Sequence, residues 1–216
     1  MKRLLDLDNP VFKFIIKIFD CIVLSVIWTV FSLPVFTMGA SSTAMYAVVY
    51  HYIRHEEGYL WKTFIKTFKE NFKRSTLSWL PLLATLLFLL YDVLALRTLI
   101  QAGNPLGRLY GVIVAFLFVA LVWAVYMAAY TARFQGTVKD MIRYSFYLLM
   151  AHPLRSLGVM VVVVGCIIMI WVVPGLAAIL PAVSFWIASP MVEQVFRLHL
   201  SPEDLKEEEE KESDRL

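Results

Sequence analysis

Four long stretches of the chain contain no charged residue: 21–53, 75–91, 109–132 and 156–192. A helix needs about 20 mainly apolar residues to cross a membrane, so the first and last stretches are long enough for two crossings each. The stretches lack the regular alternation of apolar and polar residues that is typical of a membrane β-barrel. The pattern therefore predicts an all-α polytopic membrane protein with about six membrane segments.

The first stretch is interrupted near its middle by residues that favour a turn. Pro34 has no backbone N–H to donate, Gly39 permits a sharp turn, and Ser41 can cap a helix that follows. We expect a helical hairpin over residues 12–53 that turns between residues 34 and 43. Its returning leg has about 14 residues, or roughly 21 Å, which is short for a crossing.

The last stretch is divided in the same way. Pro174 and Gly175 separate residues 157–173 from residues 176–196, which predicts a second hairpin. Pro181 is expected to kink the returning leg of this hairpin. Single crossings at about 76–98 and 109–132 lie between the two hairpins and complete the six segments.

Two more polar segments, 58–75 and 137–156, have apolar residues at helical spacing and predict amphipathic cytoplasmic helices. The first places Leu60, Trp61, Phe64, Ile65, Phe68 and Phe72 on one side and Lys62, Lys66, Lys69 and Lys73 on the other. A helix of this kind suits the inner membrane surface or an acidic groove of a partner. The second segment has the same pattern with fewer charges.

The positions of Lys and Arg predict the orientation, because these residues accumulate on the cytoplasmic side of membrane helices. Only Arg97 and Arg108 lie between residues 91 and 109, whereas every other connecting segment is richer in basic residues. If this one connection is outside, the basic segments and both termini are cytoplasmic.

Composition agrees with a membrane protein and adds a charged tail. The chain is 60% hydrophobic, with a mean hydropathy of +0.70 and a formal net charge of +3. Residues 203–216 hold eight acidic residues against three basic ones. We therefore expect a helical membrane domain over residues 1–200 and a disordered acidic cytoplasmic tail over residues 201–216, with a docking role for the tail as the alternative.

The common catalytic and nucleotide-binding motifs are missing from the sequence. Gly-Lys never occurs, which excludes a P-loop, and the HExxH, GxSxG and GxGxxG patterns are absent. His51 and His55 are spaced for one face of a helix, but no third metal ligand is evident, so interfacial histidines are the preferred interpretation. Cys21 and Cys166 lie in apolar runs and predict no disulfide. We therefore expect that the chain is not an enzyme and that it has no catalytic residue, cofactor or metal.

Ionisable residues close to the apolar stretches are candidates for function. Asp20 follows Lys17 by three residues and Glu193 precedes Arg197 by four, which predicts two pairs along helix faces. Asp92 lies near the expected outer end of the helix at 76–98. It is the candidate intramembrane functional acid, and the alternative is an interfacial residue with a local partner.

Three motifs carry a resemblance to a known family: LPVFTMGASSTAMYAVVY at 33–50, FIKTFKENFKRS at 64–75 and SFYLLMAHPLRS at 145–156. In this order and spacing the chain resembles the YesL family, small bacterial integral membrane proteins with a domain of unknown function, over about residues 8–200. The resemblance implies a bacterial plasma membrane protein that accompanies carbohydrate importers of the ATP-binding-cassette (ABC) type. It implies no catalytic residues.

We therefore expect a non-enzymatic accessory or regulatory subunit of a carbohydrate ABC importer. The expected contacts with a permease or with membrane lipids are Lys66, Lys69, Lys73 and Arg74, while Pro34, Gly39 and Ser41 shape the first hairpin. No nucleic-acid partner is expected, and a homo-oligomer stays open. The alternative is a small transporter or channel that acts alone, and an intramembrane enzyme is a third, less favoured reading.

Overall fold

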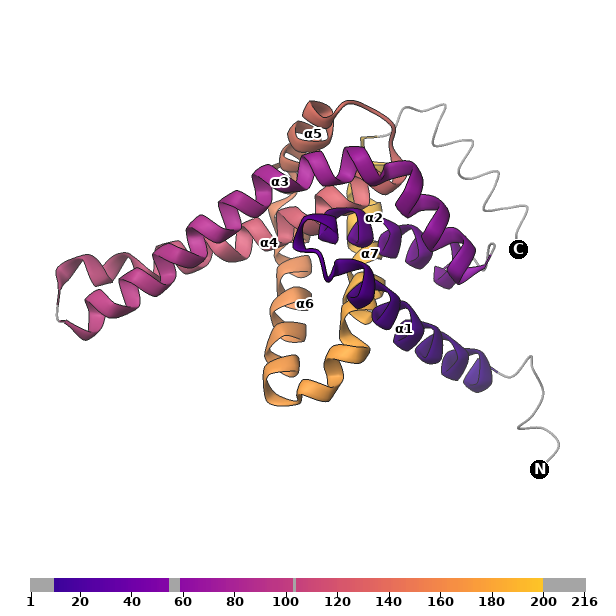
Figure 1. The fold of residues 1–216 in the computed structure, drawn as a ribbon, viewed down its shortest axis with the longest axis horizontal. Helices are drawn as coiled ribbons and strands as arrows, with labels where there is room; N and C mark the ends of the chain where they lie inside the picture. Colours follow the sequence, from indigo (N-terminus) through magenta and orange to yellow (C-terminus); the bar gives the residue numbers. More distant parts are fainter. Residues whose placement is uncertain (1–9, 55–58, 103, 200–216) are drawn as a thin grey trace.

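The computed structural model describes residues 10–54, 59–102 and 104–199 (Figure 1). Within these ranges the chain forms helices and no strand, so the all-α class is confirmed. The helices are α1 (Pro10–Ser32), α2 (Met38–Val48), α3 (Leu60–Gln101), α4 (Tyr110–Arg133), α5 (Val138–Ala151), α6 (Pro153–Val172) and α7 (Leu180–Arg197). Short 3-10 segments η2 (Val35–Thr37), η4 (Pro105–Leu109) and η5 (Pro174–Ala178) and a π-helical segment η3 (Val49–Arg54) lie between them or extend them.

The helices pack around α2, which contacts α1, α3, α4 and α7. Helices α3 and α4 lie side by side and project from the other helices as a long arm, while α6 and α7 form a second hairpin that points in a different direction (Figure 1). Apolar side chains of α2, α4, α5, α6 and α7 form the largest buried cluster. The arm and the second hairpin therefore extend from one compact centre.

Four segments among the described residues are long and apolar enough to cross a membrane. They are Ile15–Ser32, Leu60–Gln101, Pro105–Arg133 and Pro153–Val172. Helix α2 has 11 residues and is too short to cross alone, and α7, which carries Glu193 and Arg197, is not among the four segments. The fold is compatible with a multi-pass membrane protein, although two of the six expected segments do not qualify by length and composition.

Close packing positions α2 against α3. A Cβ added at Gly39 would lie 2.5 Å from the Cβ of Trp79 and 2.9 Å from the carbonyl oxygen of Ser75. Gly39 thus lies inside α2 and allows two helices to approach, and it does not form the turn that the sequence predicts. Ser41 is also inside α2, where its hydroxyl is bonded to Ser32 and to the carbonyl of Met38 instead of capping the helix.

The chain bends between α1 and α2 at Pro34, where the sequence predicts the first turn. The Thr37 hydroxyl lies within hydrogen-bond distance of the carbonyl oxygens of Phe31 (2.6 Å) and Pro34 (2.7 Å), which share its one proton. The Trp79 indole N–H donates to the carbonyl of Val35 at 3.0 Å. These bonds satisfy backbone oxygens that a broken helix would otherwise leave without partners.

Helix α3 differs most from its prediction. The amphipathic helix expected at 58–75 and the crossing expected at 76–98 are one continuous helix of 42 residues, about 63 Å long. No glycine or proline separates Arg74 from Thr76, so nothing ends the helix where its pattern changes from amphipathic to apolar. Pro81 lies inside this helix and does not end it.

The second hairpin turns through η5, which begins at Pro174. Pro181 lies in the first turn of α7, where a proline starts a helix without losing a hydrogen bond, so the predicted kink at this residue is wrong. Ser25 of α1 holds this helix start in place. Its hydroxyl donates to the carbonyl of Ile179 at 3.1 Å and accepts from the N–H of Ala182 at 3.0 Å.

Candidate functional site

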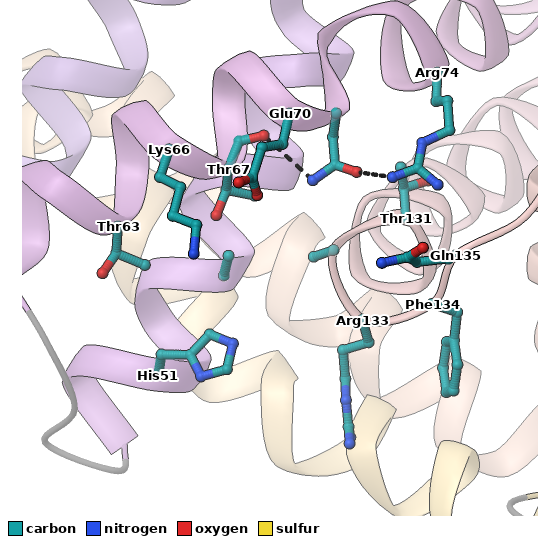
Figure 2. Close-up of a pocket in the computed structure, with 13 residues that line it drawn as sticks. His51, Thr63, Lys66, Thr67, Glu70, Arg74, Thr131, Arg133, Phe134 and Gln135 are labelled. Atoms are coloured by element: carbon teal, nitrogen blue, oxygen red, sulfur yellow. Dashed lines mark hydrogen bonds between the residues drawn. The ribbon is translucent and has the colours of Figure 1, made fainter.

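A polar cleft of about 630 Å³ lies between α2 with η3, the N-terminal half of α3, and the end of α4 (Figure 2). Its walls are rich in residues that form hydrogen bonds and in cations. The lining residues are Ala47, His51, Thr63, Lys66, Thr67, Glu70, Asn71, Arg74, Thr131, Ala132, Arg133, Phe134 and Gln135. A polar cleft of this size is the best candidate for a binding site.

Helix α3 divides the four cations that the sequence predicts as contacts into two pairs. Lys66 and Arg74 line the cleft, whereas Lys69 and Lys73 do not line it; all three lysines are exposed. Residues four or eight positions apart share one face of a helix, so Lys66, Glu70 and Arg74 follow each other along the cleft. Lys62 is exposed like Lys69 and Lys73, and we call these three residues the outward lysine face.

A short series of hydrogen bonds holds Arg74 in place. Its guanidinium donates to Oδ1 of the buried Asn71 at 2.7 Å, and Nδ2 of Asn71 donates to the carbonyl of Thr67 at 3.2 Å. Figure 2 shows both bonds, and it shows Lys66 and His51 pointing toward each other from opposite walls. Within the described part of the chain, Lys66 and Glu70 form no ion pair or hydrogen bond.

Arg133 turns its guanidinium away from Arg74 and into the protein (Figure 2). There it pairs with Glu193 of α7, and the Tyr46 hydroxyl donates to the same carboxylate. The Tyr50 ring lies 4.6 Å from the guanidinium carbon, within the range of a cation–π contact. The sequence predicts that Glu193 pairs with Arg197, but its carboxylate is bonded to residues of α2 and α4.

A second cavity of about 230 Å³ lies between α2, α3 and α4, and residues of α1, α6 and α7 also line it. Thr131 of α4 lines both cavities. The walls of the second cavity include Trp28, Trp79 and several hydroxyl side chains. Three hydrogen bonds join residues of these walls to one another: Trp28 Nε1 to the Ser42 hydroxyl (3.1 Å), the Ser75 hydroxyl to the Thr43 hydroxyl (3.2 Å) and the Thr43 hydroxyl to the Gly39 carbonyl (2.9 Å). The polar cleft therefore borders a largely apolar chamber in the centre of the fold.

The remaining candidates lie apart from these cavities or outside the description. Asp92 is on the arm and lines neither cavity. His51 lines the cleft, while His55 lies outside the described residues, as do residues 201–216 of the predicted tail. Asp20 accepts a hydrogen bond from Tyr52. Both cysteines are free, and the described ranges contain no group of three His, Cys, Asp or Glu side chains that could hold a metal.

Sequence reasoning missed Asn71, Thr131, Arg133 and Gln135 as parts of one site. Arg133 ends an uncharged stretch and Glu193 follows another, which marks both as charges near the membrane interface. The polar neutral residues give no comparable signal, because their role depends on which helices pack together.

A model of a protein family described as "Protein of unknown function, DUF624" matches residues 21–93. The match covers α2 and most of α3, and with them the first two of the three motifs that resemble YesL. No curated protein and no solved structure matches the chain. These comparisons assign no function to the cleft.

Proposed function

We propose that this chain is a non-enzymatic integral membrane accessory protein that binds another membrane protein through the outward lysine face of α3. The observation that carries the proposal is that this exposed face belongs to the same unbroken helix as the apolar arm. A partner can therefore contact the outward lysine face and the apolar arm together, because α3 holds these two surfaces at a constant distance.

Exposed side chains of the arm support a contact inside the membrane. Leu87, Phe88 and Leu94 are 57%, 64% and 56% exposed. Lipid or the helices of a partner can cover such a surface equally well, so it does not specify a partner. The outward lysine face adds charge complementarity, which selects a partner with an acidic surface near the membrane.

The proposed partner is the permease of a carbohydrate ABC importer. This choice depends on the YesL resemblance and on a cytoplasmic orientation of the lysines, as the distribution of Lys and Arg predicts. Anionic lipid is the competing ligand for the same face, because a basic helix at the inner leaflet attracts it.

Co-purification in a mild detergent tests the proposal. The tagged chain is isolated from cells that express the importer, and an unrelated tagged membrane protein of similar size serves as the control. Recovery of the permease with the chain and not with the control supports an accessory role. Recovery of lipid alone, with no permease, contradicts it.

One observation favours a second candidate function, a small transporter or channel. Thr131 lines both the polar cleft and the second cavity, so a solute path through both would pass this residue. Purified chain in vesicles should then transport a sugar or an ion, and Thr131→Trp should block this flux. Vesicles that contain the chain and show no flux above protein-free vesicles would exclude this function for the solutes tested.

A further inference from the structure

The three charges along α3 in the cleft alternate in sign. Lys66, Glu70 and Arg74 follow at intervals of four residues, so the two cations lie about 12 Å apart along the helix with the carboxylate between them. Arg74 uses one of its five N–H donors for Asn71. Lys66 and Glu70 bond to no described residue, so all three charges are available to a ligand.

A ligand that fits this series must offer a negative, a positive and a second negative group over the same length. An extended peptide meets the requirement, because residues two apart share a face and residues four apart are about 13 Å apart. An acidic, a basic and a second acidic residue at positions i, i+2 and i+4 therefore match the spacing of the cleft. The polar walls, with Thr63, Thr67 and Gln135, suit the backbone of such a segment.

The chain contains this pattern once, at Asp204, Lys206 and Glu208. These residues lie outside the described ranges. They belong to the acidic segment whose charge is opposite in sign to that of Lys66 and Arg74.

The end of α7 lies beside the cleft. The ring of Phe196 is 5.4 Å from the ring of Phe134, and Phe134 lines the cleft. Asp204 follows Phe196 by eight residues, a length of chain that can span up to about 26 Å. The acidic segment therefore starts close enough to reach the cleft without any rearrangement of the helices.

We propose that the cleft binds residues 204–208 of the same chain. Asp204 and Glu208 pair with the two cations Lys66 and Arg74, and Lys206 pairs with Glu70. Each exposed pair is weak, but the short connection to α7 gives the segment a high effective concentration at the cleft. This inference is independent of the proposed partner, because the outward lysine face is not used.

Carbodiimide cross-linking tests the proposal, since it joins only amines and carboxylates in direct contact. The full chain in detergent is cross-linked and the products are identified by mass spectrometry. We expect Lys66 to be joined to Asp204 or Glu208, and Lys69 and Lys73 on the same helix to serve as matched controls with little product. Equal yields at the three lysines would overturn the proposal.

Charge reversal makes the test specific. Lys206→Glu should lower the Lys66 cross-link about fivefold, as expected for the loss of one exposed pair. Glu70→Lys combined with Lys206→Glu should restore it, because both changes are at exposed or tail positions and only exchange the signs of one pair. Failure of the double variant to restore the yield would refute the pairing.

Cross-linking of a mixture of isotopically labelled and unlabelled chains tests whether the segment belongs to the same chain. Cross-links between a labelled and an unlabelled chain would show that a second copy supplies the segment, and this result would also refute the proposal.

Discussion

Glu193 of α7 and Arg133 at the end of α4 form a buried ion pair although they lie 60 positions apart in the sequence. Their side chains are 7% and 11% exposed. The Tyr46 hydroxyl donates to the carboxylate as well, so the pair joins α2, α4 and α7 directly behind the polar cleft. The position of Arg133 in the cleft wall therefore depends on Glu193, which does not itself line the cleft.

Removal of one charge of this pair should destabilise the fold. Glu193→Gln removes the carboxylate that pairs with the largely buried Arg133, and we expect the free energy of unfolding to fall by about 3–5 kcal/mol. Thermal unfolding of the purified protein in detergent measures the change. The matched control replaces both residues, Arg133→Met with Glu193→Met, and should lose less stability than Glu193→Gln. A double variant that is less stable than Glu193→Gln would contradict this explanation of the pair.

Gly39 should not tolerate a side chain. Gly39→Ala places a Cβ 2.5 Å from Trp79, against a neighbouring helix whose backbone is also close, so we expect a loss of roughly 1–3 kcal/mol in the free energy of unfolding. Gly165 of α6 is the control, because no atom lies within 4 Å of a Cβ added there. Gly165→Ala should be neutral or slightly stabilising in the same unfolding assay. Equal effects of the two substitutions would show that α2 and α3 do not pack this closely.

Stability should fall as the pH decreases through the titration of His152. Burial lowers the pKa of this imidazole below its ordinary value, and His199 and Arg155 lower it further. Its Nε2 is enclosed and has no hydrogen-bond partner, and the His199 ring lies 5.2 Å away. A depressed pKa means that the neutral form stabilises the fold. The contribution is complete above the unfolded pKa of about 6.5 and is lost as the pH falls toward the folded value.

Melting temperatures at pH 7.5 and 5.5 measure this effect. The decrease on acidification should be smaller in His152→Gln than in the unchanged protein, since the glutamine does not titrate. His199→Gln should also reduce the decrease, because it removes one of the groups that lower the pKa of His152. An identical decrease in all three proteins would assign the pH dependence to other residues.

The hydrophobic pattern predicts the all-α class and places both chain reversals near Pro34 and Pro174, because a proline in an apolar run is a strong local signal. It fails at α3. A change from an amphipathic to a uniformly apolar pattern marks a change of environment and not an end of the helix, and the sequence around Ser75 contains no residue that would stop it. Local rules therefore predict environments more reliably than the lengths of elements.

The candidate site was only partly accessible from the sequence. Periodicity identifies the cations of α3 but assigns them to one face, whereas the position of α4 decides that Lys66 and Arg74 line a cleft and that Lys69 and Lys73 do not. In the same way, helix spacing suggests Arg197 as the partner of Glu193, and tertiary packing supplies Arg133 instead. Contacts between distant segments depend on the packing of whole helices, which no local pattern encodes.

The orientation of the chain can be tested by thiol labelling in cells. In a cysteine-free background, Lys73→Cys should react with a membrane-impermeant maleimide only after permeabilisation, because its segment is proposed to be cytoplasmic. Gln101→Cys, at the exposed far end of α3, should react in intact cells. Labelling of position 73 in intact cells would reverse the orientation and remove the basis for a cytoplasmic partner contact.

The central claim is that the outward lysine face, and not the cleft, binds a membrane partner. Co-purification of the permease with two variants of α3 tests it most directly: Lys69→Gln with Lys73→Gln, and Lys66→Gln with Arg74→Gln. Each variant removes two positive charges from the same helix. We expect about a fivefold or greater loss of permease in the first variant and no loss in the second. Equal losses, or a loss only in the second variant, would contradict it.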